Sequence, residues 1–60
     1  MKQVEFIKFR HRNERIWLLV TKETKKYYYG IVDNTPIYKG LKYGQRKRIL
    51  KTKIFDILYK

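Results

Sequence analysis

The side chains best suited to chemistry in this sequence are cations, and they fall into three clusters. The clusters contain Arg10, Arg12 and Arg15; then Lys25 and Lys26, next to Lys22; and then Arg46, Lys47, Arg48, Lys51 and Lys53. An arginine guanidinium binds phosphate through two parallel hydrogen bonds, whereas a lysine ammonium acts as a point charge. Neutralising phosphates releases counterions from a nucleic acid, and this release supplies most of the non-specific affinity. The clusters therefore predict contacts with a phosphate backbone.

Aromatic side chains are interleaved with these cations. We interpret Trp17, Tyr27 and Tyr29 as candidate platforms for the stacking of bases. Stacking contributes about 1–3 kcal/mol per base and tolerates any base, because every base has a flat face. Cations combined with such rings are typical of proteins that bind RNA or single-stranded DNA with weak sequence preference. A helix that reads a DNA groove is not expected here.

Other chemistries find no support in the composition. The chain has no cysteine and no serine, so it has no thiol or serine nucleophile and no disulfide. His11 is the only histidine, and the five acidic residues show no metal-ligand spacing around it. Gly40 and Gly44 lack the lysine and hydroxyl neighbours of a phosphate-binding P-loop. We therefore expect a protein that is not an enzyme and that carries neither a metal nor another cofactor.

Length and charge narrow the class of protein further. The chain of 60 residues has 16 Lys and Arg against five Asp and Glu, a net charge of +11. This length predicts one small domain over residues 1–60, and so large a positive excess favours an anionic partner. An apolar content of 43% is too high for a disordered basic tail. No apolar run approaches the roughly 20 residues that span a bilayer, and residues 1–5 lack the apolar core of a signal peptide. We therefore expect a cytoplasmic protein without a membrane partner.

The elements that position these side chains are predicted to be strands. Short segments rich in β-branched and aromatic residues are separated by polar or glycine-containing turns. The expected strands cover residues 4–10, 15–21, 27–32, 46–50 and 54–58. A helix over the last 15 residues is the competing interpretation, although its closely spaced cations would repel one another. Five short strands predict an all-β fold, a small SH3-like or OB-like barrel.

The middle of the chain holds the turn signals. Residues 33–36 (DNTP) predict an Asx turn followed by the fixed φ of proline, with a ligand contact as the alternative, and residues 37–38 a short extended piece. Gly40 and Gly44 favour a tight loop with positive φ at one or both glycines.

Alternation along the second and third strands leaves apolar side chains on both faces of the sheet. We expect the aliphatic side, with Ile16, Leu18 and Val20, to form the core. The opposite face then carries Trp17, Leu19, Tyr27, Tyr29 and Ile31. A monomer rarely leaves such a patch uncovered. Three interpretations stand: another segment of the chain covers it, for instance the first strand with Phe6; it is a homodimer interface; or bases stack on it.

Four segments carry a resemblance to a known family. They are residues 14–21 (ERIWLLVT), 29–36 (YGIVDNTP), 40–45 (GLKYGQ) and 54–57 (IFDI). In order and approximate spacing they resemble the YegJ-like bacterial domain of unknown function over most of the chain. The sequence departs from that pattern at Gln45, where the family has Asp, and at Lys47, where an apolar residue is usual.

This resemblance implies an all-β fold and assigns no activity. It implies that Trp17, Gly30, Asn34, Pro36 and Gly44 occupy structural positions.

Taken together, the sequence favours a non-enzymatic domain that binds nucleic acid, with RNA or single-stranded DNA preferred. The alternative is an SH3-like protein-interaction module that binds an acidic protein or associates as a homodimer, such as a phage or mobile-element accessory protein. A third interpretation is that the charge only keeps a small protein soluble. Convergence of the basic clusters on one surface would favour binding, and dispersal would favour solubility.

Overall fold

The structure is a computed structural model in which residues 3–34 and 40–60 are described. Within these ranges lie five strands and one turn of 3₁₀-helix. They are β1 (Val4–His11), β2 (Glu14–Glu23), β3 (Tyr27–Val32), β4 (Arg46–Leu50), η1 (Lys51–Lys53) and β5 (Ile54–Tyr59). The five expected strands are confirmed, with β1, β2 and β5 slightly longer than expected. The helix considered for the last 15 residues is wrong, apart from the single turn η1.

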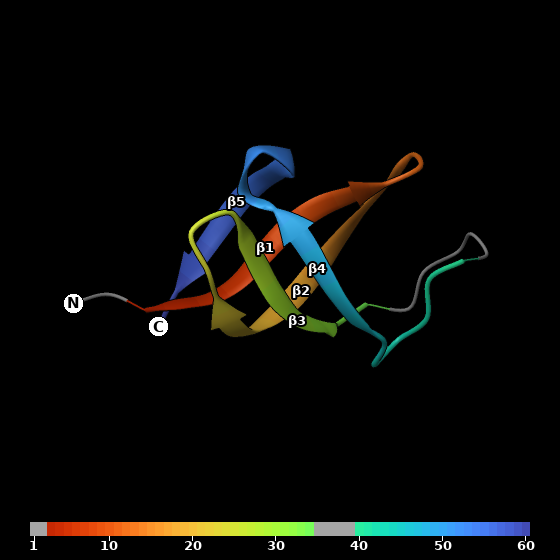
Figure 1. Cartoon of the computed structure of the whole chain (residues 1–60). Coiled ribbons are helices and arrows are strands. Elements are labelled where there is room, and N and C mark those ends of the chain that lie inside the picture. Colours follow the sequence, from red (N-terminus) through yellow and green to blue (C-terminus); the bar gives the residue numbers. More distant parts are fainter. Residues whose placement is uncertain (1–2, 35–39) are drawn as a thin grey trace.

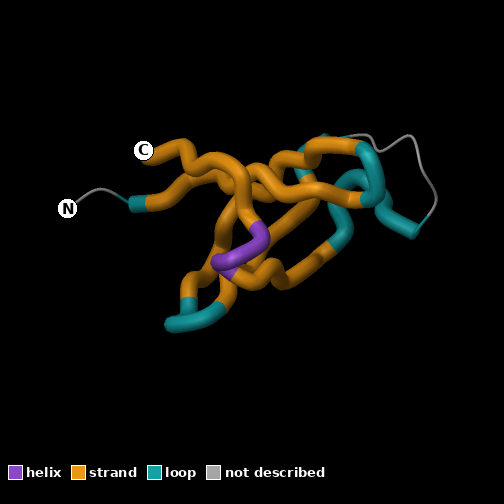
Figure 2. Tube along the Cα trace, turned by 90° about the horizontal axis from the view of Figure 1, so that it is seen from above, coloured by secondary structure: helices purple, strands orange, loops and turns teal. Residues whose placement is uncertain are grey.

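The strands form one antiparallel sheet in the order β4-β3-β2-β1-β5 (Figure 1). After β4, η1 carries the chain from one edge of this sheet to the other edge, where β5 pairs with β1. In a flat sheet of five strands the two edges would lie about 19 Å apart. Three residues of 3₁₀-helix advance only about 6 Å. The sheet must therefore be rolled, and Figure 2 shows the strands curving around in this way.

The rolled sheet is not closed into a barrel. In the described part of the chain, β4 pairs with β3 and β5 pairs with β1, and no ladder joins β4 to β5. The expected fold was therefore correct in class and in strand number but wrong in closure. The helical turn of η1 stands where the two edges approach, so the backbone there does not continue as a strand.

The core occupies the inner face of the rolled sheet. Its buried side chains are Ile7, Phe9, Ile16, Leu18, Tyr28, Val32, Leu41 and Ile49. The prediction from alternation is confirmed, because Ile16 and Leu18 are 1% and 0% exposed and Val20 packs against this cluster. Leu41 reaches the core from the connection between β3 and β4.

Two strands approach each other closely at Gly30. A Cβ atom on Gly30 would lie 2.1 Å from the backbone oxygen of Leu19 and 3.0 Å from Cγ of Leu18. Close by, a register shift between Val20 and Lys22 marks a β-bulge in β2, and bulges bend a strand and increase its twist. The bulge in β2 and the close approach thus lie next to each other, since Val20 is paired with Gly30.

The connection after β3 is tied back to β2. The backbone N–H of Trp17 donates to Oδ1 of Asn34 at 2.5 Å, and the N–H of Asp33 donates to the oxygen of Trp17 at 2.8 Å. Asn34 thus has a structural role, but this side-chain bond links the connection to β2 and is not the local bond of the expected Asx turn. Thr35 and Pro36, and the extended piece expected at 37–38, lie outside the described residues.

The loop glycines adopt the expected conformation. Gly40 has φ = 97° and Gly44 has φ = 82°, in the left-handed region that favours glycine.

At the ends of the described chain, the N–H of Lys60 donates to the oxygen of Gln3 at 2.9 Å, so β1 and β5 begin and end together (Figures 1 and 2).

Among the residues described, no helix has the length and apolar character needed to cross a membrane.

Candidate functional site

The outer face of the sheet is aromatic, as expected, and cations of the same chain lie over its rings. Nζ of Lys8 lies 4.5 Å from the centre of the Trp17 ring, and the Phe6 ring meets Trp17 edge-on at 6.3 Å. Lys8 reaches the ring because the register of β1 and β2 places it directly opposite Trp17. Trp17 is half-buried as a result. This arrangement favours cover by the same chain, through side chains of the neighbouring strand.

The other two candidate rings lie together on β3. Tyr27 and Tyr29 have ring centres 6.1 Å apart with an interplanar angle of 53°. The guanidinium of Arg48 lies 4.8 Å from the Tyr27 ring, and Nζ of Lys22 lies 5.7 Å from the Tyr29 ring. Arg48 is placed there by pairing of β3 with β4, which sets it opposite Tyr29. Two adjacent rings on β3 are therefore flanked by one cation from β2 and one from β4.

Two cavities adjoin β4 and share Lys47. The first, of about 400 Å³, lies where β4 and η1 approach the end of β1, and Phe9, Tyr27, Arg10, Arg48 and Lys53 are among its lining residues. The second, of about 380 Å³, lies over β2, β3 and β4, and Tyr29, Lys22 and Arg46 are among its lining residues. We refer to the cations and tyrosines of the two cavities as the β4 track: Arg10, Lys22, Tyr27, Tyr29, Arg46, Lys47, Arg48 and Lys53.

The charged side chains of the β4 track are all positive. Among the described residues that line the two cavities, none is acidic. Arg46, Arg48 and Lys53 are exposed and Lys47 is half-buried. Phe9 and Ile49 of the core supply an apolar floor to the first cavity. Each cavity thus combines several donors that suit phosphate with one tyrosine ring that suits a base.

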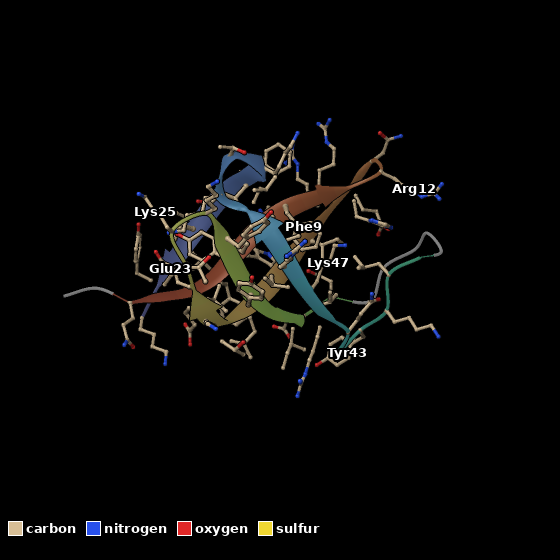
Figure 3. All side chains as sticks on the ribbon, in the orientation of Figure 1. Phe9, Arg12, Glu23, Lys25, Tyr43 and Lys47 are labelled. Atoms are coloured by element: carbon tan, nitrogen blue, oxygen red, sulfur yellow. The ribbon has the colours of Figure 1, made fainter. Side chains whose placement is uncertain are left out.

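Figure 3 shows how incompletely the basic clusters converge. Lys47 lies near Phe9 in the middle of the molecule, whereas Arg12 and Lys25 lie toward opposite ends. Arg12 is at the tip of the β1–β2 hairpin, and Lys25 and Lys26 are in the β2–β3 hairpin. Arg15 lies 6.0 Å from the ring of Phe55, on the outer face. The third cluster except Lys51 comes together with Arg10, and the rest of the predicted phosphate contacts do not join them.

Lys51 is the member of the third cluster that is held elsewhere. Its Nζ pairs with Oε2 of Glu23 at 2.5 Å and lies 5.0 Å from the centre of the Tyr28 ring. Burial raises the pKa of the Tyr28 hydroxyl, the Glu23 carboxylate raises it further, and Lys51 opposes both. These contacts connect η1 to the ends of β2 and β3. Lys51 therefore supports the rolled shape of the sheet.

Sequence reasoning did not identify several residues of the site. Phe9 and His11 line the first cavity, and Lys8 and Lys22 lie over aromatic rings. Lys22 could have been identified from the sequence, because it belongs to a basic cluster. For Lys8 the only indication was its place in the alternation of the strand, because its contact with Trp17 depends on the register between β1 and β2.

Within the described ranges, no group of three or more His, Asp or Glu side chains is placed to hold a metal ion.

No family model, curated protein or solved structure matches this chain. The likeness to the YegJ-like domain accordingly stands as an expectation from sequence.

Proposed function

We propose that this protein binds nucleic acid along the β4 track, without catalysing a reaction, and that it prefers RNA or single-stranded DNA. The observation that carries the proposal is the pair of cavities that share Lys47 as a lining residue. They bring Arg46, Lys47, Arg48 and Lys53 together with two tyrosine rings and no acid. Release of counterions by these cations supplies affinity that does not depend on sequence.

The size and form of the track favour a single strand. Cavities of about 400 and 380 Å³ fall at the small end of the range for ligand pockets, which suits individual nucleotides. Tyr27 and Tyr29 are neighbours on one strand face, 6.1 Å apart, so consecutive unpaired bases are the ligands that match them. Of the three candidate platforms, these two are the stackers we propose, because Trp17 lines neither cavity.

The same proposal includes the finer architecture. We infer an SH3-like arrangement, supported by five short antiparallel strands whose two edges are joined through one helical turn. Membership of the YegJ-like family is consistent with it and would add no activity.

The test is the salt dependence of binding by a variant of the track. Substituting Arg46, Lys47 and Arg48 together by Gln removes three phosphate contacts, and each contact to a single strand contributes about 0.7 to the slope of log K against log salt. We expect the slope to become shallower by about 2. Fluorescence anisotropy of labelled single-stranded DNA, RNA and duplex DNA, between about 50 and 200 mM salt, measures it.

The matched control removes the same charge elsewhere. Lys25, Lys42 and Lys60 are exposed and line neither cavity, so their triple change to Gln should leave most of the slope intact. Trp17 fluorescence should change little on binding, because Trp17 lies outside both cavities. Equal slopes for the two triple variants, or strong quenching of Trp17, would contradict the β4 track as the binding surface.

A further inference from the structure

The β5 edge has backbone groups that point away from the sheet. The N–H of Lys60 donates across to Gln3 of the β1 side, and successive N–H groups of a strand point in opposite directions. The N–H of Ile57, an odd number of residues away, therefore points outward. It donates to Oδ1 of its own neighbour Asp56 at 2.8 Å. A side chain thus occupies a position that a partner strand would fill.

The side chains of β5 are unusually apolar for an edge strand. Phe55, Leu58 and Tyr59 are 52%, 47% and 50% exposed. Natural edge strands are usually protected by charged residues, and β4 at the other edge has them in Arg46, Lys47 and Arg48. β5 carries Asp56 as its single charged residue. An apolar edge with outward backbone donors is the typical site for addition of an extended strand.

The charges around β5 indicate what kind of strand it would accept. Arg10 and Arg15 lie 5.4 and 6.0 Å from the Phe55 ring, and Lys53 and Lys60 immediately precede and follow the strand. A second copy of this chain would bring another net charge of +11 to the same place. Like charges brought together at an interface are strongly unfavourable, so charge complementarity selects an acidic partner.

We propose that β5 is a docking edge for an extended acidic segment of a partner protein, which adds to the sheet as a sixth strand. Its backbone would replace Asp56 at the N–H of Ile57. Its apolar side chains would pack on Phe55 and Leu58, and its carboxylates would face Arg10 and Arg15. Arg10 also lines the first cavity, so this surface adjoins the β4 track there. Among the described lining residues of the two cavities none belongs to β5, so the inference does not require nucleic-acid binding.

The experiment uses a labelled peptide with blocked ends, six residues long like β5, in which valine and glutamate alternate along one face of the strand and threonine fills the other face. We expect it to bind the whole protein and to slow hydrogen exchange at the Ile57 amide. The same peptide with all its backbone nitrogens methylated keeps its charge but loses the backbone donors of both edges, so it should bind much more weakly. Leu58→Thr should weaken binding about fivefold by removing part of an apolar contact.

Leu50→Thr is the matched control, because Leu50 is an exposed leucine on the other edge strand, 38% exposed, and it should leave peptide binding unchanged. Phe55→Thr serves as a second test variant, and the methylated peptide tests the parent protein should either variant fail to fold. Equal binding of the two peptides would overturn the proposal and leave only electrostatic attraction. The proposal would also be overturned if self-association or an oligonucleotide, and not the peptide, slowed hydrogen exchange at the Ile57 amide.

Discussion

At Gly30 a single hydrogen atom in place of a side chain decides whether two strands can approach. We expect Gly30→Ala to destabilise the fold by an amount at or above the upper end of the roughly 1–3 kcal/mol typical of overpacking. The reason is that the new Cβ would meet the backbone oxygen of Leu19 at 2.1 Å, and a backbone atom cannot rotate aside. Urea unfolding followed by Trp17 fluorescence measures the loss.

Gly44→Ala provides the comparison at residue scale. Gly44 has φ = 82°, and a Cβ added there would have no atom within 4 Å. The substitution should therefore lower the free energy of unfolding only through backbone strain, by about 1–2 kcal/mol. If Gly44→Ala were the more damaging of the two, close approach would not be the reason for glycine at position 30. The sequence indicated turn chemistry at Gly44. For Gly30 the resemblance implied a structural position but gave no reason for it, because the contact depends on the packing of β2 against β3.

Among the elements, the connection that follows β3 depends on one side-chain acceptor. We expect Asn34→Ala to lower stability by about 1–3 kcal/mol, because the half-buried N–H of Trp17 would lose the partner it now has at 2.5 Å. Asn34→Asp keeps an oxygen in that position and should restore most of the loss. Thermal unfolding of the two variants measures the difference. Equal destabilisation by Ala and Asp would show that the acceptor is not what matters.

The positions of the strands were largely predictable from the sequence, whereas the closure of the sheet was not. Alternation located β3 and β4 to the residue and separated Ile16 and Leu18 from Trp17, because side-chain direction along a strand is a local property. The helical alternative for the C-terminal segment failed because η1 lasts only three residues. Closure of a barrel was expected from strand number alone, and strand number does not determine whether two edges meet in register.

The molecule as a whole carries a net charge of +11 on 60 residues. Repulsion between these like charges therefore destabilises the folded state. We expect raising the salt concentration from about 50 to 200 mM to raise the melting temperature, because shorter screening lengths weaken this repulsion. A gain of about 1 kcal/mol corresponds to about 4–8 °C in a domain of this size.

The control for this salt effect is the triple change of Lys25, Lys42 and Lys60 to Gln. It lowers the net charge by three and should reduce the increase in melting temperature. A melting temperature that falls with salt in the parent would mean that favourable ion pairs, such as Lys51 with Glu23, outweigh the repulsion.

The sequence by itself determined the composition of the surface and the identity of the strands. Charge, the lack of cysteine and serine, and period-two alternation are properties of residues or of short segments, so they survive any arrangement of the chain. Only the tertiary structure decided which cations meet. Arg10 joins Lys47, Arg48 and Lys53 because the sheet rolls and η1 spans its edges, while Arg12 and Lys25 point elsewhere (Figure 3). Such convergence depends on contacts between residues far apart in the chain, and a local pattern does not encode them.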